Sequence, residues 1–238
     1  MKKNCIRKIS LDIETTGLNK TGPVYLGHKI IEIGAVEIIN REITKNHFHF
    51  FLNPGRLIDH EAFKIHGIKN DDLLNKPKFS DIYLNFLSYI GNSDIIVHNS
   101  KFDISFLNYE IKNLNLNYKK ISDYCHVIDT LTMARKIFPG KKNNLDALCK
   151  RYKINHSDRK LHSAFLDATL LAKLYLRMTT VQKIMNFEFC HLKNISLIKD
   201  IDKFNKDLVV LKTSKLEYNT HLEYLNNMME KSGCLWMN

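Results

Sequence analysis

The sequence has 238 residues, 44% of them hydrophobic, which is enough for a buried core and excludes a disordered or fibrous chain. The formal net charge of +11 favours a polyanionic partner such as a nucleic acid, and the basic excess lies before residue 181, because residues 181–238 hold 8 basic and 7 acidic residues. The five cysteines are scattered, and no apolar run approaches the ~20 residues of a membrane span, so we expect a soluble cytoplasmic protein with no membrane contact.

The first part of the chain is predicted to form strands. Lys8–Ile13 is a short apolar run that ends in acidic residues, and the turn signal Thr16-Gly17 follows it. Two further stretches, Ile30–Asn40 and His47–Leu52, are rich in the β-branched and aromatic residues that strands favour. Asn53-Pro54-Gly55 ends the second of these stretches.

Strands alternate with helices farther along the chain. Apolar residues at helical spacing predict a helix over Phe79–Ile90, and Asp94–Val97 is typical of a short strand. The remaining expected elements are a strand at Val127–Ile128 and helices over Phe102–Leu114, Leu131–Phe138, Leu145–Tyr152 and Ala164–Met178. This order predicts an α/β fold with a mixed sheet.

The pattern changes beyond residue 180. We expect one folded domain over 1–180, a tether over 181–207 and a small tail over 208–238, with Leu208–Leu211 as a candidate strand. In the tail, an apolar stripe at helical spacing predicts an amphipathic helix. The stripe consists of Tyr218, Leu222, Leu225 and Met229. Because so short a segment cannot bury this stripe by itself, its natural acceptor is the surface of a partner.

The first chemical motif is the pair Asp12 and Glu14. Residues i and i+2 of a strand project from the same face, so these two carboxylates stand side by side at the strand end. Two like charges repel unless a cation lies between them, and Mg²⁺ or Mn²⁺ prefers such oxygen ligands. The alternative is an ordinary solvated strand end.

Two further motifs carry Asp103, His162 and Asp167. Asp103 opens a helix directly after a strand, where its alternative role is an N-terminal cap. His162 and Asp167 would lie on different faces of a single helix, because five residues turn through about 500°. Both side chains reach one site if His162 lies on the preceding loop and Asp167 in the first turns. A structural histidine is the alternative.

Together the three motifs resemble those of the DEDDh-type 3′–5′ exonucleases, which have a ribonuclease H-like mixed sheet flanked by helices. The resemblance implies that Asp12, Glu14, Asp103 and Asp167 hold two divalent metal ions, Mg²⁺ or Mn²⁺, and that His162 is the general base. A sister group of exonucleases has tyrosine four residues before the last aspartate. This sequence has Ser163 there, so it is similar to the histidine type.

Longer segments resemble the epsilon family, the proofreading subunits of bacterial DNA polymerase III. The matching segments are His28–Ala35, Glu61–Gly67, Phe138–Lys141 and Leu145–Cys149. The resemblance implies that Glu61 and His66 contact the terminal nucleotide of single-stranded or frayed DNA 3′ ends, together with Asp12, Glu14 and Asp167. For Glu61 and His66, a plain surface helix end is the alternative.

The C-terminal part is also similar to the epsilon family. Residues 182–187 resemble its Gln-x-x-Met-x-Phe peptide, which implies that Gln182, Met185 and Phe187 bind the sliding clamp. An unspecific tether segment is the alternative, and this linker lacks the usual glutamine-rich stretch. The tail 208–238 resembles the segment that binds the polymerase III alpha subunit. Whether a small theta-like subunit binds the nuclease domain stays open.

Three hypotheses about function follow. The first is a proofreading exonuclease of the replicative polymerase, which selects mispaired 3′ ends because they fray more readily than paired ends. The second is a free-standing exonuclease that trims RNA 3′ ends, which would not need residues 179–238. The third is a non-catalytic scaffold between polymerase and clamp, which would not need the intact set Asp12, Glu14, Asp103, His162 and Asp167.

Overall fold

The computed structural model describes residues 7–114, 119–156, 161–193 and 213–232. The chain divides into two compact units, Met1–Met185 and Asn186–Asn238. Within the described residues, no helix is long and apolar enough to cross a membrane.

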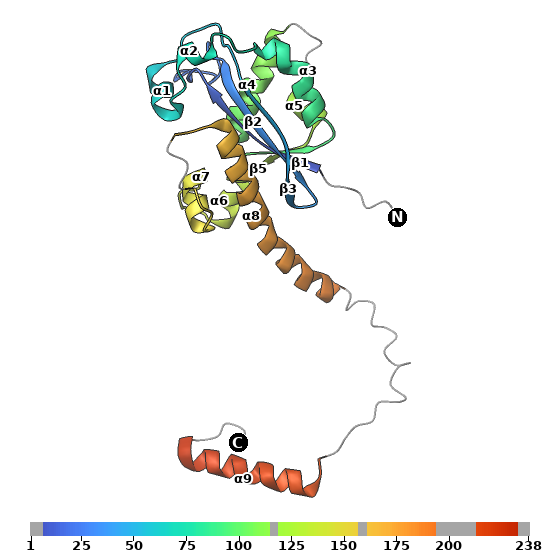
Figure 1. The fold of residues 1–238 in the computed structure, drawn as a ribbon. Coiled ribbons are helices and arrows are strands. Elements are labelled where there is room, and N and C mark those ends of the chain that lie inside the picture. Colours follow the sequence, from blue (N-terminus) through green and yellow to red (C-terminus); the bar gives the residue numbers. More distant parts are fainter. Residues whose placement is uncertain (1–6, 115–118, 157–160, 194–212, 233–238) are drawn as a thin grey trace. The chain divides into compact units, whose positions relative to one another are not determined.

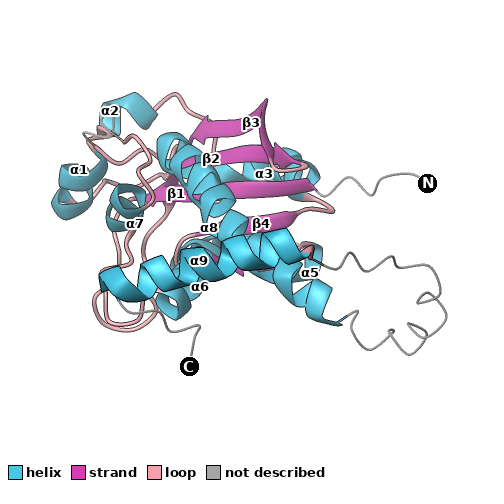
Figure 2. Ribbon diagram, turned by 90° about the horizontal axis from the view of Figure 1, so that it is seen from below, coloured by secondary structure: helices cyan, strands magenta, loops and turns pink. Residues whose placement is uncertain are grey.

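The first unit is built on a five-stranded mixed sheet in the order β3-β2-β1-β4-β5. Its strands are β1 (Arg7–Thr15), β2 (Ile30–Ile39), β3 (Glu42–Phe51), β4 (Asp94–Val97) and β5 (Val127–Asp129). The first three pair antiparallel, whereas β4 and β5 continue the sheet in parallel. Figure 2 shows β3, β2, β1 and β4 side by side in this order. The predicted mixed α/β fold is confirmed.

Helices cover both faces of this sheet and enclose two separate hydrophobic cores (Figure 1). The first core packs α3 (Phe79–Ile90), α4 (Ser100–Asn113) and α5 (Ile121–Tyr124) against one face. The second packs α6 (Thr130–Ile137), α7 (Leu145–Arg151) and α8 (Ala164–Lys193) against the other. Two short helices, α1 (His60–His66) and α2 (Asn70–Leu73), follow β3.

Side-chain alternation along β1 divides these two faces. Ile9, Leu11 and Ile13 are buried in the first core, so Asp12 and Glu14, which alternate with these residues, project from the opposite face, where α8 lies. Helices α6 and α7 begin at side-chain caps, because Asp129 accepts from Leu131 N and Asn144 accepts from Ala147 N.

Most predicted elements match the structure within a few residues, and α3 has the predicted bounds. β3 begins earlier than expected, at Glu42, because it pairs with β2 back to their connecting turn. α8 runs on to Lys193 and so includes the start of the predicted tether. Neither proline nor glycine interrupts this stretch. The predicted strand Leu208–Leu211 lies outside the described residues.

The second unit contains α9 (Lys215–Ser232), which confirms the helix predicted from the apolar stripe. Ser214 and Glu217 begin it with reciprocal hydrogen bonds, as in a capping box. Tyr218 and Met229 of the stripe are 57% and 47% exposed. The helix therefore carries an exposed apolar surface.

Candidate active site

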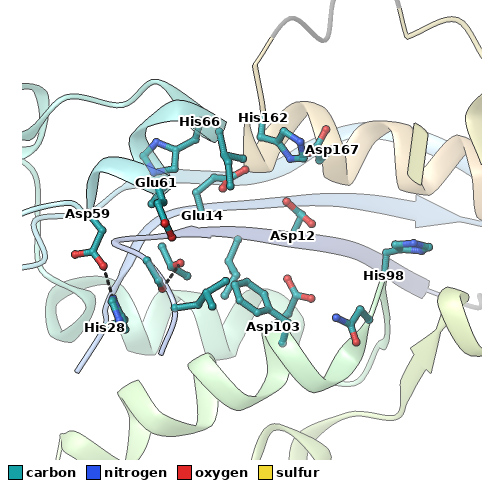
Figure 3. Close-up of a pocket in the computed structure, with 18 of the residues that line it drawn as sticks. Asp12, Glu14, His28, Asp59, Glu61, His66, His98, Asp103, His162 and Asp167 are labelled. Atoms are coloured by element: carbon teal, nitrogen blue, oxygen red, sulfur yellow. Dashed lines mark hydrogen bonds and ion pairs between the residues drawn. The ribbon is translucent and has the colours of Figure 1, made fainter. Parts of the chain in front are cut away.

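A cavity of about 810 Å³ opens beside the end of β1 (Figure 3). It is lined by residues of β1, α1, α4, the start of α7 and the start of α8. All seven residues predicted to act in catalysis or substrate binding line it, namely Asp12, Glu14, Glu61, His66, Asp103, His162 and Asp167. Residues that are far apart in the sequence thus share one pocket.

The floor of the cavity is the acidic end of β1. Asp12 and Glu14 stand opposite Gly34 and Glu32 of β2 in the antiparallel register. A Cβ atom at Gly34 would lie 2.3 Å from the backbone of Ala164, the first residue of α8. Because Gly34 has no side chain, the start of α8 packs directly on the sheet beside the two carboxylates.

This close approach brings His162 and Asp167 to the same place. His162 lies on the loop before α8, and Asp167 lies in the first turn, where its amide donates to Ser163 O. His162 Nδ1 is 3.3 Å from Asp167 Oδ2. Their spacing in the sequence allows both side chains to reach one site only if His162 precedes the helix and Asp167 lies in its first turns, and the structure has this arrangement.

Asp103 closes the cavity from α4. Its side chain is 2% exposed, and burial raises the pKa of its carboxyl to about 8, opposed by backbone hydrogen bonds. The nearby charge of Asp129 raises the pKa further. Asp129 accepts from the Asn99 and Ser100 amides, which form the turn at the start of α4. Without a cation, the fold favours the protonated Asp103.

Glu61 and His66 lie on α1 at the other side of the cavity (Figure 3). Glu61 is exposed and pairs with Lys20 Nζ at 2.9 Å. His66 is 5% exposed, and its Nδ1 accepts a hydrogen bond from the Ile68 amide at 3.0 Å. Burial lowers the pKa of His66, so the ring is neutral near pH 7 with its proton on Nε2.

The donors in this cavity suit hard divalent cations. One ligand atom each of Glu14, His162 and Asp167 lies within 4.8 Å of the others, and Asp12 and Asp103 face the same space. Four carboxylates in one partly enclosed site repel one another unless positive charge is bound between them. Oxygen donors of this kind match Mg²⁺ or Mn²⁺.

Other lining residues were not predicted as site residues. They include His28, Asp59, His98, Asn99, Asn144 and Asp146. His98 lies directly after β4 and five residues before Asp103. Its closeness to Asp103 in the sequence could have marked it as a candidate site residue. Asp59 lies in the loop before α1, outside every predicted strand, helix and motif, so no sequence pattern marked it as a site residue. The predicted clamp residues Gln182, Met185 and Phe187 fall in the part of α8 whose side chains lie outside the described residues.

Comparisons with known sequences place exonucleases among the relatives of this chain. A sequence model of the exonuclease family matches residues 9–175. The DNA polymerase III subunit epsilon of Escherichia coli K12 is 46% identical over 235 residues, covering 97% of this chain and 97% of its own length. The subunit of the same name from Buchnera aphidicola subsp. Schizaphis graminum is 52% identical over 231 residues, covering 96% of this chain and 99% of its own.

Solved structures of exonucleases share the fold. Exonuclease X in complex with 5′ overhanging duplex DNA is 27% identical, with a TM-score of 0.56 over 74% of this chain and 92% of its own. The nuclease domain of 3′hExo, a DEDDh family member bound to rAMP, has a TM-score of 0.63 over 76% of this chain and 94% of its own. At 15% identity, this second likeness concerns the fold alone.

Proposed function

Since this chain belongs to the exonuclease family and, within it, to the DNA polymerase III epsilon subunits, we propose that it hydrolyses mispaired 3′-terminal nucleotides during replication. It is a 3′–5′ exonuclease that proofreads for DNA polymerase III. The observation that carries the catalytic assignment is the cavity that gathers Asp12, Glu14, Asp103, His162 and Asp167. The reaction depends on divalent metal ions.

The proposed mechanism gives each residue a separate task. Asp12, Glu14, Asp103 and Asp167 would hold two ions, Mg²⁺ or Mn²⁺, and such ions would activate the attacking water and stabilise charge on the leaving 3′ oxygen. His162 takes the proton of this water as the general base. The water oxygen bonds to phosphorus as the P–O3′ bond breaks, and the terminal nucleotide leaves with its 5′ phosphate. The exposed side of His162 lies open to solvent for release of the proton.

Substrate selection follows from the shape and position of the cavity. Glu61 and His66 border it at α1, and we assign them contacts with the terminal nucleotide, together with Asp12, Glu14 and Asp167. A cavity of this kind accepts a single-stranded 3′ end. Mispaired ends separate more readily than paired ends, so such a site removes errors without reading the base sequence.

The chain associates with DNA polymerase III and with DNA, and finer assignments are part of the proposal. Residues 1–180 form the nuclease domain, and 208–238 bind the polymerase alpha subunit through the apolar stripe of α9. Residues 182–187 within 181–207 contact the sliding clamp through Gln182, Met185 and Phe187. A theta-like subunit is a further candidate partner of the nuclease domain, and the expected location is the bacterial cytosol.

The test compares substrates on the purified chain with Mg²⁺. We expect release of single nucleotides from the 3′ end of single-stranded DNA and of mispaired duplex, and slower release from fully paired duplex. The readout is the rate of nucleotide release from 5′-labelled strands, with an EDTA control. Fast trimming of RNA with little action on DNA would instead indicate an RNA 3′-end exonuclease. A chain inactive on all of these substrates would be a polymerase–clamp scaffold.

A further inference from the structure

A buried carboxylate outside the proposed catalytic set ties the start of α8 to the sheet. Glu32 in β2 is 1% exposed and stands opposite Glu14 in the strand pairing. Its Oε1 accepts a hydrogen bond from Ser163 Oγ at 3.0 Å and lies 2.8 Å from His49 Nε2. Burying a carboxylate is costly unless hydrogen bonds replace its lost hydration. The two groups at Oε1 supply part of this compensation, whereas Oε2 is buried with no hydrogen-bond partner among the described residues.

The two partners of Glu32, Ser163 and His49, both act at the start of α8. Ser163 immediately precedes the helix. The ring of His49 stacks on Phe165, with centroids 5.0 Å apart and planes 19° apart. Glu32 therefore holds Ser163 directly, and the stack on His49 holds the residue after Ala164. These contacts fix the position of the helix start relative to β2 and β3.

The loop before Ser163 is held from the other side by α1 and its end. The His162 amide donates to Ile65 O at 3.1 Å. A Cβ atom at Gly67 would lie 2.6 Å from Leu161 Cδ1, so Leu161 packs directly on the glycine. Three consecutive residues are thus held by different neighbours: Leu161 by Gly67, His162 by Ile65 and Ser163 by Glu32. The backbone of His162 is fixed on both sides, while its side chain is 44% exposed at the cavity.

We propose that Glu32 and Ser163 form a positioning pair for the general base His162. The Ser163–Glu32 hydrogen bond fixes the backbone from which the imidazole reaches the attacking water, and neither residue takes a proton in the reaction. This inference rests on the proposed function. Placement of this kind matters because a displacement of 1 Å in a catalytic group can lower a rate by about 10²-fold.

The test uses the full chain with Mg²⁺ on single-stranded DNA and measures kcat, KM and melting temperature. We expect Ser163→Ala to lower kcat about 10-fold with KM unchanged, and Ser163→Thr, which keeps the hydroxyl, to restore most of the rate. The matched control is Thr169→Val, which removes a hydroxyl of the same helix that donates to Phe165 O and does not touch Glu32. This control should retain the parent kcat.

A double variant separates positioning of the base from a general effect on the fold. His162→Ala should lower kcat by about 10²–10⁴, and His162→Ala with Ser163→Ala should be no slower, since the pair acts only through the base. If the kcat losses of the two single variants multiply in the double variant, Glu32 and Ser163 do not act through His162, and the inference is overturned. An unchanged kcat in Ser163→Ala, with an active parent and an impaired His162→Ala, overturns the inference alone. An inactive parent overturns the proposed function as well.

Discussion

Asp103 is a proposed metal ligand whose pKa is changed by burial. The unfolded chain ionises this carboxyl near its ordinary pKa of 3.8, whereas the ion-free fold holds the pKa near 8. The folded pKa is therefore above the unfolded pKa. The stability that protonated Asp103 contributes is complete below pH 4, falls as the pH rises and is lost by about pH 8. A bound cation reverses this effect, because it favours the carboxylate.

Asp103→Asn should consequently separate stability from activity. In EDTA at pH 8, the variant should melt at a higher temperature than the parent, because its amide carries no buried charge, and the difference should shrink as the pH falls toward 4. Added Mg²⁺ should stabilise the parent more than the variant. Thermal melts across pH 4–9, with and without Mg²⁺, measure these differences. A variant that melts below the parent at pH 8 in EDTA would contradict the assignment of burial as the cause.

At the scale of elements, the site depends on how α8 meets the sheet. Gly34 in β2 lets the backbone of Ala164 and Phe165 come within 2.3 Å of the place where a Cβ atom would be. Farther along, Arg41 holds the same helix by donating to Leu176 O and to the hydroxyl of Thr180. These contacts fix both the approach and the direction of α8, and through them the position of Asp167.

Gly34→Ala should therefore displace the start of α8. We expect turnover to fall about 10- to 100-fold and the fold to lose about 1–3 kcal/mol, the usual cost of overpacking. Nucleotide release at saturating DNA and a urea unfolding curve measure the two effects. Gly91→Ala is the matched control, because its Cβ atom would lie 3.2 Å from the nearest atom, Leu87 O, and far less must move. A Gly34→Ala variant with the rate and stability of the parent would show that close packing of α8 on Gly34 does not position the site.

At the scale of the whole molecule, the two units differ in how much apolar surface they bury by themselves. The unit Met1–Met185 has two hydrophobic cores and contains the complete cavity. The unit Asn186–Asn238 contains α9, whose Tyr218 and Met229 are exposed. An amphipathic helix of this length is stabilised mainly by packing its apolar face. Catalysis and assembly are therefore expected to separate along the chain.

Removal of residues 208–238 should test this separation. A chain that ends at Asp207 should degrade single-stranded DNA at the parent rate and should no longer co-elute with the polymerase alpha subunit in size-exclusion chromatography. In the full chain, Leu222→Asp with Leu225→Asp should have the same effect on binding. Thr220→Asp with Asn227→Asp adds equal charge to the opposite helix face and should preserve binding. Binding by the shortened chain would show that the tail is not the polymerase contact.

The grouping of Asp12, Glu14, Asp103, His162 and Asp167 rests on the resemblance of their motifs to those of an exonuclease family. The sequence by itself determined the mixed α/β class and the order of the strands and longer helices, because period-2 and period-3.6 patterns are local. It did not determine that α8 continues to Lys193, since weak periodicity does not mark a helix end, nor did it single out Glu32 among the residues of β2.

Only the tertiary structure decided how near these residues lie to one another. The contact of Glu32 with Ser163 joins residues 131 positions apart, and the importance of Gly34 depends on a helix that begins at Ala164. Such contacts arise from packing between elements, and no periodic pattern in either segment records the partner. The sequence thus indicated which groups to propose for the chemistry, and the fold decided how β1, β2 and α8 place them, because distance and burial are properties of packed elements.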